Sequence, residues 1–296
     1  MTASHRPLAP LALALAAACA IGGCDQEPGS TMDYEAVVHV EIGTLTKVPF
    51  VAKALKESTV DGDVDLSVCR DALLSADALT VGTGNRTFEL YLSGTLDKTA
   101  VDTCHAALED AHRKSHGKAD AKSTKKVEVH WLSPTLFAIV GAEGTPPVPS
   151  KARLQSLLAN DPTPTTANPS ALWVVARDDE GKKDVSHVEA WADVTKGLDL
   201  HADVEFDSIT DATKIYGQAM LGLSALKAAG ELGDMSDAVS LSHGGDTLTV
   251  EVHATRKQLE GLATKISSEH SKGPHRKHGG DSHGVSIRIG TSEDAD

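Results

Sequence analysis

Alternation of apolar and polar residues predicts four strands along the chain. The clearest is 198–206, LDLHADVEF, where every second residue is apolar and those between are acidic or histidine. Similar alternation predicts strands at 34–42, 88–92 and 247–253. An antiparallel sheet commonly buries one side of such strands and leaves the other in water. We therefore expect an outward-facing acidic surface that contains Asp199, His201, Asp203, Glu205, Glu251 and His253.

Apolar residues that recur every three or four positions predict helices at 49–56, 66–75, 97–114, 150–159, 211–232 and 255–267. The order of strands, hairpins and helices is similar before and after a Pro/Thr-rich segment at 161–170, which predicts a linker. The expected fold is α+β, with two similar halves of ββα units at 34–160 and 171–290. We expect mainly antiparallel sheets with helices on one face.

The first 23 residues contain one basic residue, no acidic one, and an apolar run at Leu8–Gly23. This run is too short to span a bilayer, which takes about 20 apolar residues, so residues 1–23 are predicted to be a signal peptide. The stretch Ile21–Cys24 resembles the bacterial lipobox. That resemblance implies that Cys24 is lipidated and that cleavage occurs just before it. Cys19 is a competing position, and an ordinary secretory signal is the alternative.

Residues 24–33 have no apolar pattern and are predicted to form a flexible tether. If Cys24 is lipidated and Cys19 is removed, Cys69 and Cys104 remain. An even pair of cysteines in an oxidising compartment predicts a disulfide, with two buried free thiols as the alternative. The chain as a whole resembles predicted envelope lipoproteins of Gram-negative bacteria, which have a lipobox, paired cysteines and repeated ββα units. The resemblance implies a membrane-anchored protein facing the periplasm or the cell surface, and it implies no activity.

The chain is acidic, with 42 Asp and Glu against 28 Lys and Arg and a formal net charge of −14. This balance argues against binding nucleic acid or anionic lipid headgroups. The expected partners are the membrane, through the lipid anchor, and a protein or small molecule that the sequence does not identify. Trp191 falls on the polar side of its strand, which indicates a covered or adhesive surface there.

Three segments have residue types that bind metals. His105, Glu109, His112 and His116 share one stripe of the helix at 97–114, a spacing that suits transition metals. The alternative is a solvated polar stripe, which is the ordinary pattern for a surface helix. A His/Gly-rich loop at 268–284 precedes a last strand at 285–289 and an acidic tail at 291–296. Asp61–Asp65 begins like a calcium loop but lacks its glycine and its glutamate. No cofactor is expected, unless a transition metal binds the helix stripe.

Motifs of common enzyme classes are missing from the sequence, and Gly82-Thr83-Gly84 lacks the third glycine of a dinucleotide-binding loop. We therefore expect a lipid-anchored, non-catalytic binding or interaction module. One alternative is a metal-binding lipoprotein that uses the histidine and glutamate clusters. A second is an enzyme whose acidic site lies on the outward sheet face.

Overall fold

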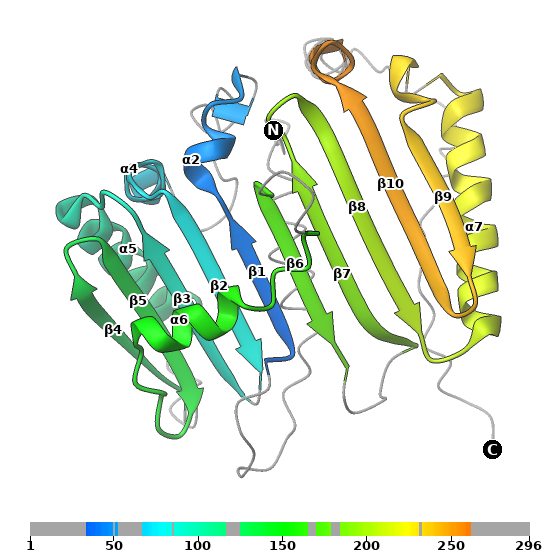
Figure 1. Ribbon diagram of the computed structural model, residues 1–296. Helices are drawn as coiled ribbons and strands as arrows, with labels where there is room; N and C mark the ends of the chain where they lie inside the picture. The colour runs from blue at the N-terminus through cyan, green and yellow to red at the C-terminus, as the bar shows by residue number, and fades with distance from the viewer. Residues whose placement is uncertain are drawn as a thin grey trace, which may run out of the picture.

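Ten strands pair into one sheet in the order β4-β5-β3-β2-β1-β6-β7-β8-β10-β9, and every neighbouring pair is antiparallel (Figure 1). The computed structural model describes residues 34–49, 51–52, 67–84, 86–116, 125–164, 170–178, 184–230 and 233–261, except for the side chains of 67–68, 108–116 and 125. The mixed α and β composition expected from the sequence is confirmed, with one large sheet in place of several.

The strands are β1 (Ala36–Val40), β2 (Ala78–Gly84), β3 (Thr87–Ser93), β4 (Lys125–Ser133), β5 (Leu136–Glu143), β6 (Leu172–Arg177), β7 (Val185–Asp193), β8 (Gly197–Phe206), β9 (Val239–Gly244) and β10 (Thr247–Thr255). The helices are α2 (Ile42–Leu45), α4 (Ser67–Ser75), α5 (Lys98–His116), α6 (Lys151–Leu158) and α7 (Ile209–Ala228), with a 3-10 turn, η2, at Gly233–Met235. Residues 256–261 are also helical.

The periodic segments of the sequence correspond closely to these elements. The four alternating segments are β1, β3, β8 and β10, and four of the six predicted helices are α4, α5, α6 and α7. The other two, at 49–56 and 255–267, lie partly outside the described residues. A serine begins both α6 and α7: Ser150 Oγ accepts a hydrogen bond from the Arg153 amide, and Ser208 Oγ accepts one from the Asp211 amide.

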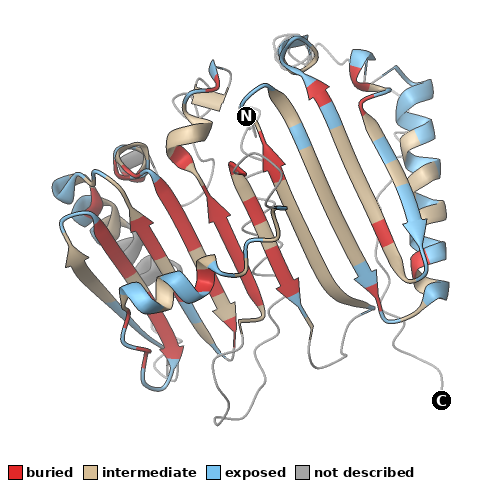
Figure 2. Cartoon of the chain, in the orientation of Figure 1, coloured by how far each residue is buried: buried red, intermediate tan, exposed pale blue. Residues whose placement is uncertain are grey.

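Both faces of the sheet are covered around β1. Val38 and Val40 point toward α4 and α5, whereas Val37 points to the opposite face, where it belongs to a cluster with Leu157 of α6. All five residues of β1 are therefore buried (Figure 2). Farther along the sheet, β7 and β8 are mostly half-buried over their whole length. Burial thus decreases from β1 toward β7 and β8.

The expectation that all helices lie on one face is wrong. The helix α6 crosses in front of the strands in Figure 1, on the face opposite to α4, α5 and α7. Gly82 of β2 permits this arrangement, since a Cβ atom there would lie only 2.5 Å from Leu157 Cδ2. Gly82-Thr83-Gly84 therefore lies within a strand, and its first glycine serves helix packing.

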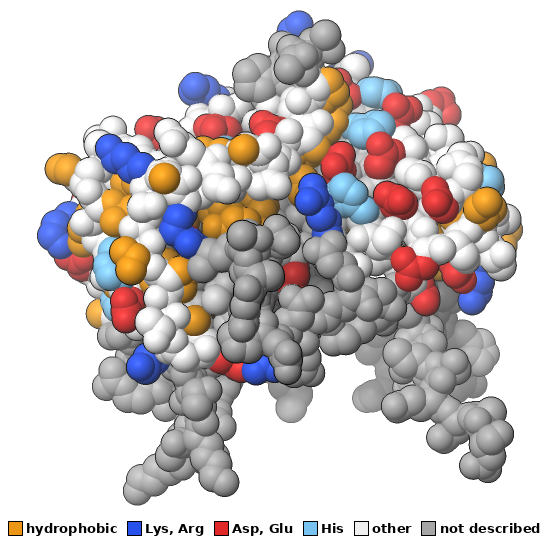
Figure 3. Space-filling model, turned by 60° about the horizontal axis from the view of Figure 1, so that its bottom comes forward, with side chains coloured by type: hydrophobic (Ala, Val, Ile, Leu, Met, Phe, Trp, Pro, Cys, Tyr) orange, Lys and Arg blue, Asp and Glu red, His pale blue; other side chains and the backbone are white. Residues whose placement is uncertain are grey.

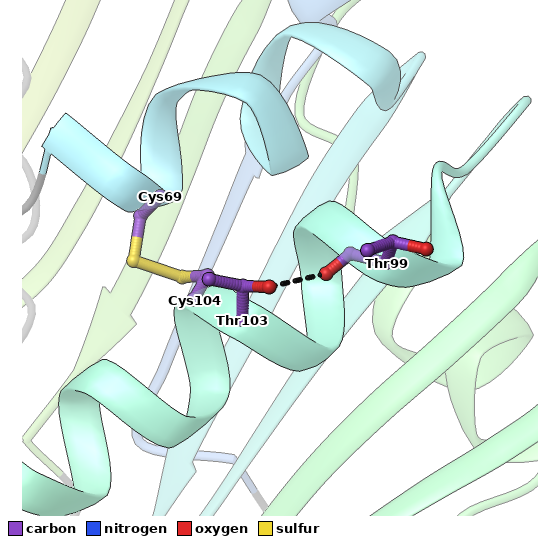
Figure 4. The surroundings of a disulfide bond; sticks show 4 residues. All are labelled: Cys69, Thr99, Thr103 and Cys104. Atoms are coloured by element: carbon purple, nitrogen blue, oxygen red, sulfur yellow. Dashed lines mark hydrogen bonds between the residues drawn. A yellow bond between two sulfur atoms is a disulfide. The ribbon is translucent and has the colours of Figure 1, made fainter.

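Cys69 of α4 and Cys104 of α5 form the predicted disulfide, with Cα atoms 4.5 Å apart (Figure 4). The bond joins the two helices that pack together over β1, β2 and β3. Beside Cys104 in the chain, Thr103 Oγ1 donates a hydrogen bond to the Thr99 carbonyl at 2.7 Å. The disulfide therefore holds one helix layer of the first part of the chain together.

Candidate functional site

The face of the sheet on which α6 lies changes character along its length. Over β2 and β3 it is covered by α6, whereas among the described helices none lies over β7, β8 and β10 on that side (Figure 1). These three strands present a surface that we call the acidic-histidine face, which consists of His187, Glu189, Asp199, His201, Asp203, Glu205, Glu251 and His253.

Strand register places these side chains on one face, because directly paired residues of neighbouring strands point to the same side of a sheet. The pairs are His201 with Glu251 and Trp191, His253 with Asp199, and His187 with Glu205. The outward direction predicted for the polar residues of 198–206 and 247–253 is confirmed. The strand β7 adds His187 and Glu189, which the sequence pattern did not single out.

The acidic-histidine face is open to solvent. Its least exposed side chain in an ion pair is His187, at 27%, and its most exposed is His253, at 64%. Figure 3 shows acidic and histidine side chains gathered together over one part of the surface. A ligand could therefore reach these groups without displacing a helix of the described part of the chain.

Imidazoles bridge the carboxylates of this face. His201 Nε2 lies 3.0 Å from Asp203 Oδ2, and its Nδ1 lies 3.7 Å from Glu251 Oε1 across the strand boundary. His201 therefore lies between two acidic groups, from β8 and β10. This arrangement places an imidazole between two carboxylates.

The other two histidines have similar neighbours. His253 Nδ1 is 2.8 Å from Asp199 Oδ1. His187 Nε2 lies 3.2 Å from Glu189 Oε1, and its Nδ1 lies 4.0 Å from Glu205 Oε2. Every ion pair that these carboxylates form within the described part of the chain is with an imidazole.

The surroundings of Asp203 on this face shift the pKa of its carboxyl group. Burial raises its pKa, but the hydrogen bonds from Thr249 and His201 together lower it by more than burial raises it. The pKa of Asp203 therefore lies below its usual range. Thr249 Oγ1 donates to Asp203 Oδ1 at 2.6 Å. Asp203 is therefore held in its charged form at neutral pH.

An aromatic row adjoins the acidic-histidine face. The Trp191 ring stacks on His201, with centroids 5.9 Å apart, and on the neighbouring strands Trp173 stacks on His39 at 5.4 Å. Trp173 is buried, whereas Trp191 is half-buried. The position of Trp191 on the polar side of its strand is confirmed, and there it forms one border of the acidic surface.

A second polar cluster lies beneath α6 and was not predicted from the sequence. Arg153 of α6 forms an ion pair with Glu89 of β3, whose side chain has no exposed surface. Tyr91 donates a hydrogen bond to Glu89 Oε2 at 2.7 Å, and Tyr34 donates one to Oε1 at 3.3 Å. The sequence signal for this cluster was Glu89, the second residue of the strand segment FELYL, because a buried charge needs a partner.

The acidities of this cluster follow from burial and from the charge of Glu89. Burial, followed by the negative charge of Glu89, raises the pKa of Tyr34 to about 12. Burial and the hydrogen bond to Glu89 also raise the pKa of Tyr91. The hydrogen bonds that Arg153 donates to Glu89 raise the pKa of the guanidinium. The raised pKa values keep both phenols neutral and the guanidinium charged. The result is an ion pair flanked by two neutral phenols, an arrangement suited to fixing α6 on the sheet.

The predicted metal ligands of α5 are only partly described. His105 is half-buried, and the side chains of Glu109, His112 and His116 lie outside the described residues. Within the described part, no group of three or more His, Cys, Asp or Glu side chains is arranged to hold a metal ion. Cys24, the signal peptide and tether, Asp61–Asp65, and the segments at 268–284, 285–289 and 291–296 also lie outside the described residues.

Comparisons with protein-family models, with curated proteins and with solved structures gave no match. Among the described helices, none is both long enough and apolar enough to cross a membrane.

Proposed function

We propose that this protein is a lipid-anchored cell-envelope protein that acts as a non-catalytic binding module facing the periplasm. Its binding surface is the acidic-histidine face. The observation that carries this proposal is the contrast along one sheet face, which α6 covers at β2 and β3 and which is open and strongly polar at β7, β8 and β10. An exposed set of charged side chains on a rigid sheet is suited to recognising a charged partner.

The anchor is supported by the sequence around Cys24, where an apolar segment ends in Ile-Gly-Gly-Cys and acidic residues follow. A lipid anchor would keep the binding surface close to a bilayer. The disulfide between Cys69 and Cys104 is consistent with an oxidising compartment such as the periplasm.

The anchor is tested by the intact mass of the protein extracted from its own membrane. The expected mass corresponds to cleavage before Cys24 with acyl chains attached. The Cys24→Ser variant should lose the acyl mass and leave the membrane fraction, whereas Cys19→Ser should behave as wild type. A bare polypeptide mass for the wild-type protein would overturn the anchor.

The binding role is tested in the same native mass spectra. A bound partner should be retained by wild-type protein and lost when Asp199 and Glu251 are replaced by Asn and Gln. Glu128→Gln is the matched control, because Glu128 lies on the outer strand β4, exposed, next to an imidazole at 3.2 Å. Equal retention of the partner by all variants would exclude the acidic-histidine face as its binding surface.

We also propose that the chain is built from two copies of one folding unit. Counted outward from the pair β1·β6, the strand order is β1-β2-β3-β5-β4 on one side and β6-β7-β8-β10-β9 on the other, which supports this proposal. The third strand is followed by a long helix in both cases, α5 and α7. In an experimental structure, a half-turn about the pair Val38·Val174 should superpose the copies better than any shifted register. An equally good fit for a shifted register would contradict the duplication.

A further inference from the structure

The acidic-histidine face has an internal charge imbalance that depends on pH. It holds five carboxylates and three imidazoles on three adjacent strands. With neutral imidazoles the carboxylates repel one another across strand spacings of about 4.8 Å. With protonated imidazoles most of this charge is compensated within the face itself. The face is therefore more negative with neutral imidazoles than with protonated ones.

The covered part of the same sheet face shows how the chain neutralises a carboxylate there. Glu89 is paired with the guanidinium of Arg153, which α6 brings to it. The carboxylates of the acidic-histidine face have no such Lys or Arg partner among the described residues, and their ion pairs are with imidazoles alone. A cation from outside the chain would fill the role that Arg153 fills beside Glu89.

From this complementarity we propose that the acidic-histidine face binds a lysine- or arginine-rich polypeptide segment, and that protons on His187, His201 and His253 compete with it. The inference rests on the proposed binding role and names the chemical class of the partner and the regulation of the site. No bond is made or broken in this step, because one set of positive charges replaces another beside the same carboxylates.

An extended segment fits the spacing of the face. Same-side residues of a strand recur about every 7 Å, and Asp199, Asp203 and Glu205 all lie on one side of β8. An extended partner with a basic residue at every second position has the same repeat. A helix cannot pack on the acidic-histidine face in the way that α6 packs on β2 at Gly82. The half-turn that superposes β1 on β6 puts Trp191 at the place of Gly82, and its indole fills the space that α6 uses.

The groups around each histidine set the sign of the pH dependence. His187 faces Glu189 and Glu205 and is paired across the strand boundary with Arg177 of β6. His201 faces Asp203, Glu251 and the Trp191 ring. His253 faces Asp199, which is paired with Asp193 of β7. The carboxylates of these surroundings outnumber their one permanent cation, Arg177. Each proton gained by an imidazole therefore cancels negative charge that would otherwise attract the partner.

The test uses the full mature protein and a fluorescent peptide of alternating lysine and threonine. The peptide should bind at pH 7.5 and about tenfold more weakly at pH 5.5, and added salt should weaken it at both values. A peptide of alternating glutamate and threonine should not bind. Binding that is equal at both pH values, or equal for the two peptides, would overturn the proposal.

Two sets of variants locate the effect. Replacing Asp199 by Asn and Glu251 by Gln should weaken binding about tenfold at pH 7.5, whereas Glu128→Gln should leave it unchanged. Replacing all three histidines by Gln should abolish the difference in peptide affinity between pH 7.5 and pH 5.5. Circular dichroism of each variant checks that the sheet is intact. A lipidated protein that binds neither peptide would overturn this inference and leave the lipid anchor of the proposed function standing. A protein without acyl chains that binds the lysine peptide in a pH-dependent way would overturn the anchor and leave this inference standing.

Discussion

Arg153 Nε donates hydrogen bonds to both carboxylate oxygens of Glu89, each at 3.0 Å, and Glu89 is fully buried beneath α6. A buried carboxylate is costly in free energy unless a cation and hydrogen-bond donors surround it. Arg153 supplies the charge, and Tyr91 and Tyr34 supply further donors. The position of α6 on the sheet is thus coupled to the charge state of a single side chain of β3.

Arg153→Met should lower the free energy of unfolding by about 3–5 kcal/mol, because it leaves the Glu89 charge buried without a partner. Urea denaturation followed by circular dichroism measures the change. Adding Glu89→Gln to Arg153→Met should recover part of the loss, since the buried charge is then removed as well. A double variant no more stable than Arg153→Met would show that the charge of Glu89 is not the cause.

Alkaline pH should destabilise the same region. The pKa of Tyr34 is about 12 in the folded protein, against 10.0 as the ordinary value. Above pH 10 the unfolded chain therefore releases a proton that the folded chain retains, and stability should fall as the pH rises from 10 to 12. Thermal unfolding at several pH values across this range measures the effect. Tyr34→Phe should make the fall shallower, and an unchanged slope would contradict the role of Tyr34.

The sequence predicted which residues share a side of a strand but not what covers each side. In 198–206 the alternating polar residues point to solvent, as expected. In 88–92 the same pattern predicts that Phe88 is buried, yet Phe88 is 36% exposed and Glu89 is fully buried. Glu89 is buried because α6, whose Arg153 is 64 positions away in the sequence, covers the polar side of β3. Local alternation contains no information about such a distant helix.

Part of the candidate site could also be predicted from the sequence. The acids and histidines of β8 and β10 were recognised because apolar residues alternate strictly with them. His187 and Glu189 were not, because the large apolar Trp191 lies on their side of β7 and small alanines lie on the other, which weakens the contrast. The pairing of β7 beside β8 requires the sheet topology, which sequence periodicity alone does not determine.

Removing the disulfide should lower stability and loosen the helix layer over β1, β2 and β3. Cys69 and Cys104 are separated by 35 positions, and a cross-link over such a loop contributes about 3–4 kcal/mol by restricting the unfolded chain. The double substitution of both cysteines by alanine, compared with wild type in guanidinium denaturation, measures this contribution. Reducing agent should destabilise the wild-type protein and leave the double variant unchanged. A matching response of the two proteins to reductant would contradict the assignment.

Gly82→Ala should destabilise the protein by disturbing the contact between α6 and β2. A Cβ atom at Gly82 would lie 2.5 Å from Leu157 Cδ2 and 3.0 Å from Tyr34 Cδ1, so the helix must shift or Leu157 must change rotamer. Overpacking of this kind costs about 1–3 kcal/mol. Gly217→Ala is the matched control, because Gly217 lies within α7 and a Cβ atom there would point into open space. That substitution should stabilise the protein by about 0.5–1 kcal/mol through helix propensity. Denaturation midpoints for the two variants give the comparison, and a Gly82→Ala protein as stable as wild type would mean that α6 does not pack closely on β2.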